Sequence, residues 1–255
     1  KEFLSDKRVI EVNPILWQLI LNLFILTFRP AKTAKAYQKI WMKKQKMSPL
    51  RYFTIKQTTN LKQRMKNKFI EIDYAMRYGN PSIAKKLSEL KEKGCQEMVI
   101  LPLYPQYAAA TTATVCDEVY RTLMKMRWQP SLQVIPHYES EPLYIKAIAV
   151  SIKKVLRKIN WTPDVIVASY HGVPKKYFDK GDPYHCYCHK TTRLLVEHMK
   201  IDIPIVTTFQ SRFGPEEWLK PYTDETIDNF PNEGTKKILV ICPGFASDCV
   251  ETLEE

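Results

Sequence analysis

Apolar positions along the chain fall into short continuous runs, separated by longer stretches in which they recur every three or four residues. The continuous runs predict buried strands, and the longer stretches predict amphipathic helices. Strands are predicted at 68–79, 97–107, 132–138, 164–172, 203–211 and 236–245. Helices are predicted at 81–94, 112–128, 141–159, about 190–199, 215–219 and from Ser247 onward.

Apolar strands that alternate with helices are typical of parallel sheets covered by helices on both faces. Two successive sets of three strands therefore predict an α/β protein built from two Rossmann-like, doubly wound lobes. We place the boundary near residue 140, before the long helix, so that the lobes are 1–140 and 141–255. The first lobe lacks its first strand and both ends look cut, so we expect a fragment of a longer chain.

The first strongly apolar stretch, 14–28, is interrupted by Gln18 and Asn22. It is shorter than the roughly 20 residues that a membrane span needs. Its apolar residues occur all round the helix, which favours a core helix. A helix that lies on a membrane surface is the alternative.

Composition narrows the function classes. Only 7 glycines occur, and neither a G-x-G-x-x-G nor a P-loop motif is present, so we expect no NAD or ATP chemistry. The net charge of +12 suits a solvated lysine face, an anionic substrate or an anionic lipid surface. The densest basic cluster, 39–46, contains no nucleic-acid motif, so nucleic acid is not an expected partner. The six cysteines are scattered, which indicates a reducing, cytoplasmic setting.

A histidine marks one predicted strand end. In open α/β sheets, ligands bind beyond the carboxyl ends of the strands. The strand at 164–172 runs directly into His171 and Gly172, and a glycine there permits a tight turn that leaves one face of the imidazole open. His171 is therefore a candidate catalytic residue, with a hydrogen-bonded structural histidine as the alternative.

The last predicted helix carries carboxylates. Asp248, Glu251 and Glu255 are spaced i, i+3 and i+7, which places them on one helix face. Such a column near a histidine suits Fe(II), Co(II) or Zn(II) and also suits proton transfer. Asp248 and Glu251 equally fit a helix capping box.

Two further groups are chemically ambiguous. Cys186 and Cys188 lie between two histidines, and on a loop the two thiolates would reach one metal or cluster. A bare C-x-C is a weak signal, and incidental thiols are the alternative. Tyr104 and Tyr107 flank a proline at a strand end, where they suit either a core or the wall of a flat apolar ligand.

Six segments then combine in one order. They are RYG (77–79), LPLYPQYAAATT (101–112), SYHGVPKKYFDKGDPY (169–184), TTRLL (191–195), FQSRFGPEEWLKPYT (209–223) and PGFASDCVETLEE (243–255). Together they closely resemble the bacterial ferrochelatases along essentially the whole chain.

The resemblance implies chelatase-type lobes around a porphyrin cleft and a lyase that inserts Fe(II) into protoporphyrin IX as the last step of haem biosynthesis. It implies that His171 and Glu251 act in catalysis and contact the metal, in the C-terminal lobe, and that Asp248 and Glu255 extend the acidic line. The residues it places along the cleft or metal route are Arg77, Tyr78, Tyr104 and Tyr184.

No cofactor beyond the substrate Fe(II) is expected. Some ferrochelatases bind a [2Fe-2S] cluster, but Ala109 stands where the animal enzymes have a cysteine, and their C-terminal cysteine tail is absent here. A cluster on Cys186 and Cys188 is not predicted, although they remain candidate ligands.

The mechanism expected from the resemblance has His171 accept pyrrole protons and briefly contact the metal while Glu251 acts opposite it. The enzyme would be cytoplasmic, with the 14–28 helix as a candidate peripheral contact to the inner membrane. Three rivals stay open: a non-catalytic tetrapyrrole or metal-binding module of the periplasmic-binding type, a chelatase for another tetrapyrrole, and a truncated, inactive chelatase.

Overall fold

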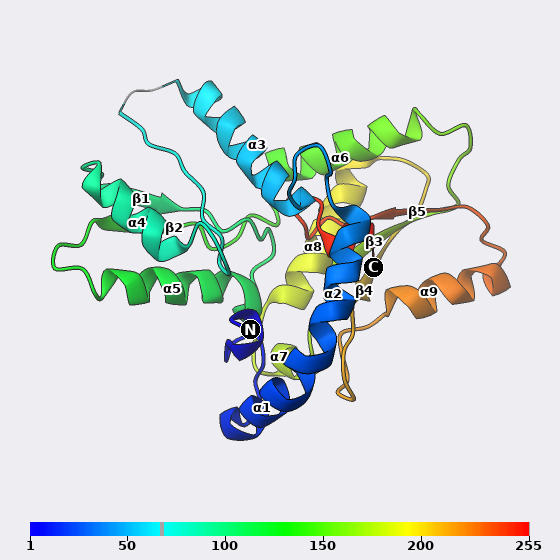
Figure 1. Cartoon of the computed structure of the whole chain (residues 1–255). Coiled ribbons are helices and arrows are strands. Elements are labelled where there is room, and N and C mark those ends of the chain that lie inside the picture. The colour runs from blue at the N-terminus through cyan, green and yellow to red at the C-terminus, as the bar shows by residue number, and fades with distance from the viewer. Residues whose placement is uncertain (67–68, 255) are drawn as a thin grey trace. The chain divides into compact units, whose positions relative to one another are not determined.

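The structure is a computed structural model that describes residues 1–66 and 69–254 (Figure 1). Its contacts divide the chain into two compact units. Unit 1 contains Lys1–Pro102, Ala109–Pro136 and the segment from Ser247 onward, and unit 2 contains Leu103–Ala108 and His137–Ala246. The sequence-based boundary at 140 lies near the passage between the units at 136–137, and the segment that carries Glu251 groups with unit 1.

Unit 1 is mainly helical around a two-stranded sheet. Strands β1 (Glu97–Ile100) and β2 (Ser131–Val134) pair in parallel, with Glu97 opposite Ser131. The remaining elements are η1 (Phe3–Ser5), α1 (Pro14–Ile20), η2 (Leu21–Ile25), α2 (Leu26–Ile40), α3 (Pro49–Met65), α4 (Ile83–Glu92), η3 (Ala109–Ala113), α5 (Thr114–Leu123) and α10 (Val250–Leu253).

The predicted strand at 68–79 is wrong for the residues that can be judged, since 67–68 lie outside the described part of the chain. Residues 69–75 form no strand, and Met76 makes an isolated bridge to Ser82. The alternating carboxylates of this segment are bound by lysines at α4 instead, with Asp73 2.9 Å from Lys86 and Glu71 2.8 Å from Lys93. Within the part of the chain that the structure describes, the first sheet therefore has two strands rather than the predicted three.

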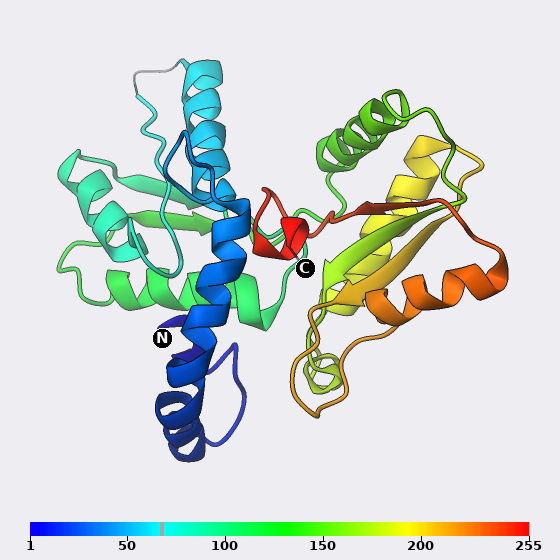
Figure 2. The ribbon, with the colours of Figure 1, turned by 45° about the vertical axis from the view of Figure 1, so that its right-hand side comes forward.

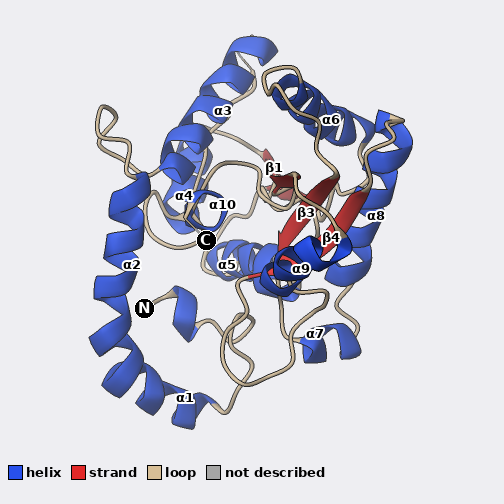
Figure 3. Cartoon of the chain, turned by 90° about the vertical axis from the view of Figure 1, so that its right-hand side faces the viewer, coloured by secondary structure: helices blue, strands red, loops and turns tan. Residues whose placement is uncertain are grey.

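The prediction that 14–28 is a core helix is wrong, because most of its apolar side chains are exposed. Elements α1, η2 and α2 follow one another without a break as one bent helical rod (Figure 3). Only 6% of its most apolar stretch of 18 residues is buried, although the side chain of Leu21 is fully buried. By length and composition alone, Pro14–Ile40 is able to cross a membrane.

Unit 2 is built on a three-stranded parallel sheet. The strands are β3 (Val165–His171), β4 (Ile205–Gln210) and β5 (Ile238–Ile241), in the order β4-β3-β5. The surrounding helices are α6 (Pro142–Leu156), α7 (Lys175–Asp179), α8 (Tyr184–Met199), α9 (Thr223–Asn229) and η4 (Phe230–Glu233). Two parallel sheets with helical connections confirm the predicted α/β class.

Helices cover both faces of this sheet (Figure 2). On one face, Ile166 packs with buried side chains of α6 and α8, among them Ile152 and Leu195. On the other face, Val165 and Val167 pack against Phe230, which follows α9. Alternate residues of β3 are therefore buried in opposite directions, as the pleat of a strand requires.

Two helix predictions in unit 2 differ from the structure. The segment at 215–219 is not a helix, because its backbone hydrogen-bonds another segment: Lys175 N donates to Glu217 O (2.8 Å) and Leu219 N donates to Val173 O (3.0 Å). Helix α8 begins six residues earlier than the predicted start at Lys190, since the Asp182 carboxylate accepts from the backbone N–H of Tyr184 at 3.0 Å.

A buried charge fastens α8 to the segment that enters unit 2. The Glu139 side chain is 0% exposed and lies 2.8 Å from Lys190 Nζ and 2.6 Å from His137 Nδ1. The hydroxyl of Thr191 also donates to Glu139 O at 3.0 Å. Burial alone would raise the pKa of this carboxyl, but the bonds from Lys190 and His137 outweigh it and lower the pKa.

We predict that Glu139→Gln lowers the free energy of unfolding by about 1.5–3 kcal/mol at neutral pH, the range for a lost hydrogen bond to a charged group. Because the pKa of Glu139 is lowered in the folded state, its contribution is complete above the unfolded pKa and is lost as pH falls through the folded pKa. The acid-induced loss of stability should therefore be shallower in the variant.

Urea unfolding at several pH values measures both effects. Glu197→Gln is the matched control, because Glu197 pairs with Arg193 on the exposed face of α8, the helix that carries Lys190. A surface pair contributes about 0–1 kcal/mol. Equal destabilisation by both variants would contradict the prediction.

Candidate active site

His171 is the last residue of β3, the central strand of unit 2. The preceding residues, 165–170, are all buried, and His171 is the first residue that solvent partly reaches. It pairs with Gln210 at the end of β4, and Gly172 N donates to Gln210 O at 2.8 Å. The carboxyl ends of two neighbouring strands thus hold this histidine in place, as the sequence predicts.

A hydrogen bond assigns the two ring nitrogens of His171. Its Nδ1 lies 2.6 Å from the carbonyl oxygen of Gly172. A carbonyl only accepts, so Nδ1 carries the proton that makes this bond. In the neutral imidazole the lone pair is then on Nε2. Nε2 is therefore the ring nitrogen of His171 that has a lone pair to offer.

Gly172 is needed because two chain segments approach it closely. A Cβ at this position would lie 2.9 Å from Gln210 O and 3.2 Å from the Trp218 ring. The first contact is with backbone, which cannot move without shifting the end of β4. Glycine therefore sets the spacing between the two strand ends beside His171.

The acidic residues belong to a shorter helix than predicted. Helix α10 begins at Val250 rather than Ser247, and Asp248 precedes it as an exposed residue. The capping box is formed by Cys249 and Thr252, with Cys249 N donating to Thr252 Oγ1 at 3.0 Å. Asp248 accepts from the same hydroxyl at 3.3 Å. The alternative interpretation of Asp248 and Glu251 as a capping box is therefore wrong.

Within unit 1, α10 lies against α2. Lys39 Nζ is 2.6 Å from a carboxylate oxygen of Glu254. Burial raises the pKa of Tyr37, and the charge of Glu251 raises it further, so this tyrosine stays protonated beside the half-buried carboxylate. Glu255, the third member of the predicted acidic line, lies outside the described residues. Sequence reasoning missed Tyr37 and Lys39, because no local signal links 37–39 to 251–254.

Arg77 and Tyr78 share one partner in unit 1. Asp6 lies 2.6 Å from Arg77 Nη2 and accepts from the Tyr78 hydroxyl at 3.0 Å. Arg77 Nε also donates to Thr114 O at 2.7 Å, and its guanidinium lies 4.3 Å from the centre of the Tyr78 ring. Burial raises the pKa of the Tyr78 phenol. The structure thus brings these two predicted residues together around Asp6, which no sequence pattern indicates.

The two other predicted aromatic residues belong to unit 2. Tyr184, at the start of α8, is buried in a cluster with Tyr170 and Phe209. Burial raises the pKa of Tyr184 well above its usual value, so the phenol is neutral. Tyr104 is half-buried in the segment before Gln106, whose amide donates to Thr191 of α8 at 2.9 Å.

Cys186 and Cys188 are both on helix α8 rather than on a loop. Cys186 is exposed and Cys188 is fully buried, so the two thiols point to different sides of the helix. Burial raises the pKa of Cys188 well above its usual value, which favours the thiol over the thiolate that binds metals. The structure therefore does not bring these two sulfurs together.

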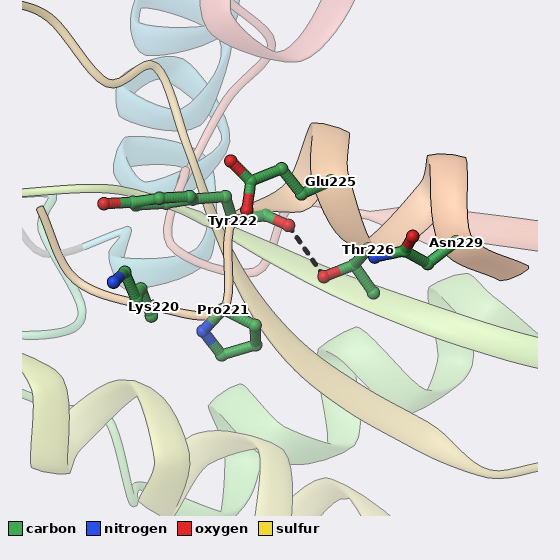
Figure 4. Close-up of a pocket in the computed structure, with 6 residues that line it drawn as sticks. All are labelled: Lys220, Pro221, Tyr222, Glu225, Thr226 and Asn229. Atoms are coloured by element: carbon green, nitrogen blue, oxygen red, sulfur yellow. Dashed lines mark hydrogen bonds between the residues drawn. The ribbon is translucent and has the colours of Figure 1, made fainter.

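A surface depression of unit 2 lies apart from the predicted site residues. A depression of about 460 Å³ lies along α9 and the residues that precede it (Figure 4). It is lined by Lys220, Pro221, Tyr222, Glu225, Thr226 and Asn229. No predicted site residue lines it. Among residues 1–66 and 69–254, no group of three or more His, Cys, Asp or Glu side chains is arranged to hold a metal ion.

Known proteins identify the family. The model of the ferrochelatase family matches residues 1–255. A ferrochelatase of Rhizobium meliloti is 51% identical over the whole chain, which covers 76% of that relative. Ferrochelatases of Francisella tularensis subsp. novicida and Agrobacterium fabrum are each 50% identical, with 77% and 74% of their lengths covered. The chain belongs to the ferrochelatase family.

Family membership confirms the resemblance found in the sequence, and with it the class of metal-chelating lyases. It also confirms that the two parallel sheets belong to a Rossmann-like ferrochelatase fold. The chain spans about three quarters of the length of these relatives.

We predict that Gly172→Ala lowers chelatase activity about 10²-fold, because the added methyl group displaces the end of β4 and with it His171. A displacement of about 1 Å in a catalytic group has this order of effect. Metalation rate and thermal unfolding are measured together. Loss of activity should exceed the fraction of protein that is unfolded, and unchanged activity would contradict the assigned close approach.

Proposed function

We propose that this chain inserts Fe(II) into protoporphyrin IX and releases two protons, the last step of haem biosynthesis. The observation that carries the proposal is the ferrochelatase-family match along residues 1–255. The non-catalytic alternative, a module that only binds a tetrapyrrole or a metal, is not favoured by that match. The reaction needs only the substrate metal, so no resident cofactor is assigned.

Two pyrrole protons must leave as iron enters the macrocycle. His171 is proposed to accept them at Nε2 one at a time, with the first proton released to solvent before the second is taken. The bond from Nδ1 to the Gly172 carbonyl supports this role, because it leaves Nε2 as the basic atom and holds the ring in one orientation. An imidazole is suited to this transfer because its ordinary pKa lies near working pH.

The carboxylates are proposed to handle cations. Glu251 supplies an anionic oxygen to Fe(II) or to a departing proton, and Asp248 extends that role into solvent. Their different exposure supports this division, because Asp248 is exposed whereas Glu251 is half-buried. Glu255, which lies outside the described residues, is proposed as a third member of the same acidic series.

Four residues are proposed to contact the porphyrin or to line the metal route. They are Arg77, Tyr78, Tyr104 and Tyr184. The phenols of Tyr78 and Tyr184 stay neutral because burial raises their pKa, which suits contact with an apolar macrocycle.

We predict that His171→Ala lowers metal insertion by about 10²–10⁴-fold, the usual contribution of a positioned acid or base, while porphyrin binding is retained. Formation of zinc porphyrin followed by fluorescence measures insertion, and quenching of the free porphyrin measures binding. His198→Ala, on the exposed side of α8, is the control and should leave both unchanged. Normal insertion by His171→Ala would refute the assignment.

We further propose a cytoplasmic enzyme that docks on the inner membrane through the exposed apolar side chains of Pro14–Ile40. These are Ile15, Leu16, Leu19, Leu23, Phe24 and Phe28. Basic residues follow in the same rod, including Lys32 and Lys35, which suits an anionic lipid surface. An apolar substrate such as protoporphyrin would arrive from that surface.

Phe28→Glu should weaken binding to anionic liposomes by roughly tenfold or more, because burial of a phenylalanine is worth about 1.5–3 kcal/mol. Co-sedimentation with liposomes measures this. Met124→Glu is the matched control, since Met124 is 81% exposed and Phe28 is 73% exposed, both in unit 1. Equal binding by the parent and both variants would refute the docking proposal and leave the chelatase assignment untouched.

A further inference from the structure

Two histidines of α8 stand one helical turn apart, outside the chemistry described so far. The ring centres of His185 and His189 are 4.5 Å apart, and the planes are tilted by 49°. His185 also stacks on Phe209 at 5.8 Å and meets Phe178 at 5.1 Å. Residues at i and i+4 of a helix project to the same side, so the two imidazoles are neighbours on one side of α8.

The ring nitrogens of this pair have no hydrogen-bonding partner in the described part of the chain. Within residues 1–66 and 69–254, His185 and His189 make ring contacts but no hydrogen bond or ion pair. Other histidines differ, since His137 Nδ1 lies 2.6 Å from Glu139 and His171 Nδ1 donates to Gly172 O. An imidazole whose nitrogens have no protein partner is free to bind a metal.

Local electrostatics keep both rings in the form that binds metals. Burial lowers the pKa of His185, and burial together with the neighbouring His185 lowers the pKa of His189. A neutral imidazole offers a lone pair, whereas a protonated ring does not. Since protonation is disfavoured here, little proton competition opposes a metal at neutral pH.

We propose that His185 and His189 form a surface site for a divalent transition metal, with copper, nickel and zinc as the class of ion. Imidazole nitrogen suits these ions, and affinity in a given nitrogen site is highest for Cu²⁺. The protein supplies two ligands in this site and water supplies the others. His189 is exposed and His185 is half-buried, so an ion reaches the pair from solvent.

This site is separate from the proposed reaction centre of unit 2. His185 and His189 pack on Phe209, which shares a cluster with Tyr170 on the α8 side of the sheet. His171 is the next residue after Tyr170, so its side chain points to the opposite face. A metal bound by His185 and His189 therefore does not use His171 as a ligand.

The test is a titration of the whole chain with Cu²⁺ in the absence of porphyrin. Calorimetry measures affinity, and electron paramagnetic resonance detects coupling of the copper to two imidazole nitrogens. We expect His189→Ala and His185→Phe each to weaken this site at least tenfold and to remove the two-nitrogen signal. Phenylalanine keeps the ring packing on Phe209, so loss of binding is not a consequence of lost folding.

His198→Ala is the matched control, because His198 is exposed on the last turn of the same helix, and it should bind Cu²⁺ as the parent does. Unchanged isotherms in His189→Ala and His185→Phe would overturn the proposal and leave the pair as aromatic packing over Phe209. Metal insertion is measured in parallel and should be unaltered in His189→Ala. Copper binding therefore tests the surface site, and metal insertion tests the chelatase assignment, independently of each other.

Discussion

The burial of β3 is the constraint on which the chemistry of unit 2 depends. This strand has β4 on one side and β5 on the other, and Val165 to Tyr170 are all buried. Ile166 and Tyr170 face α8, while Val165 and Val167 face Phe230. A shift of one residue in register would exchange these two sets. The same shift would turn His171 to the wrong face, so packing of the core sets the direction of the proposed base.

Different sides of helix α8 make different kinds of contact. Cys188, Leu195 and Met199 face the core, where Cys188 is a neutral thiol. Lys190 binds the buried carboxylate of Glu139. Thr191 accepts from Gln106, which fastens the segment containing Tyr104 to the same helix. The cysteine and histidine cluster that looks like one metal site in the sequence is thus divided among packing, an ion pair and a surface pair of imidazoles.

Sequence patterns predict unit 2 better than unit 1, for a physical reason. Strands β3, β4 and β5 are continuous apolar runs with helices on both faces, and few other structures would bury them. The 69–75 segment has a mixed pattern, and its carboxylates find lysines on α4. The 217–219 segment carries helix-forming residues, but its backbone pairs with 173–175. Tertiary contacts determine the conformation of both segments, and the local sequence pattern carries no information about those contacts.

The position of His171 follows from local sequence, because a strand end and a glycine are adjacent in the chain. The surroundings of Arg77 do not, because its partner Asp6 lies 71 residues away. Both side chains of this pair are nearly buried, at 13% and 12% exposure. Removal of either would leave an uncompensated charge away from water. The guanidinium of Arg77 therefore depends on Asp6 for its counter-charge, so the surroundings of this proposed cleft residue are set by a residue that is distant in the sequence.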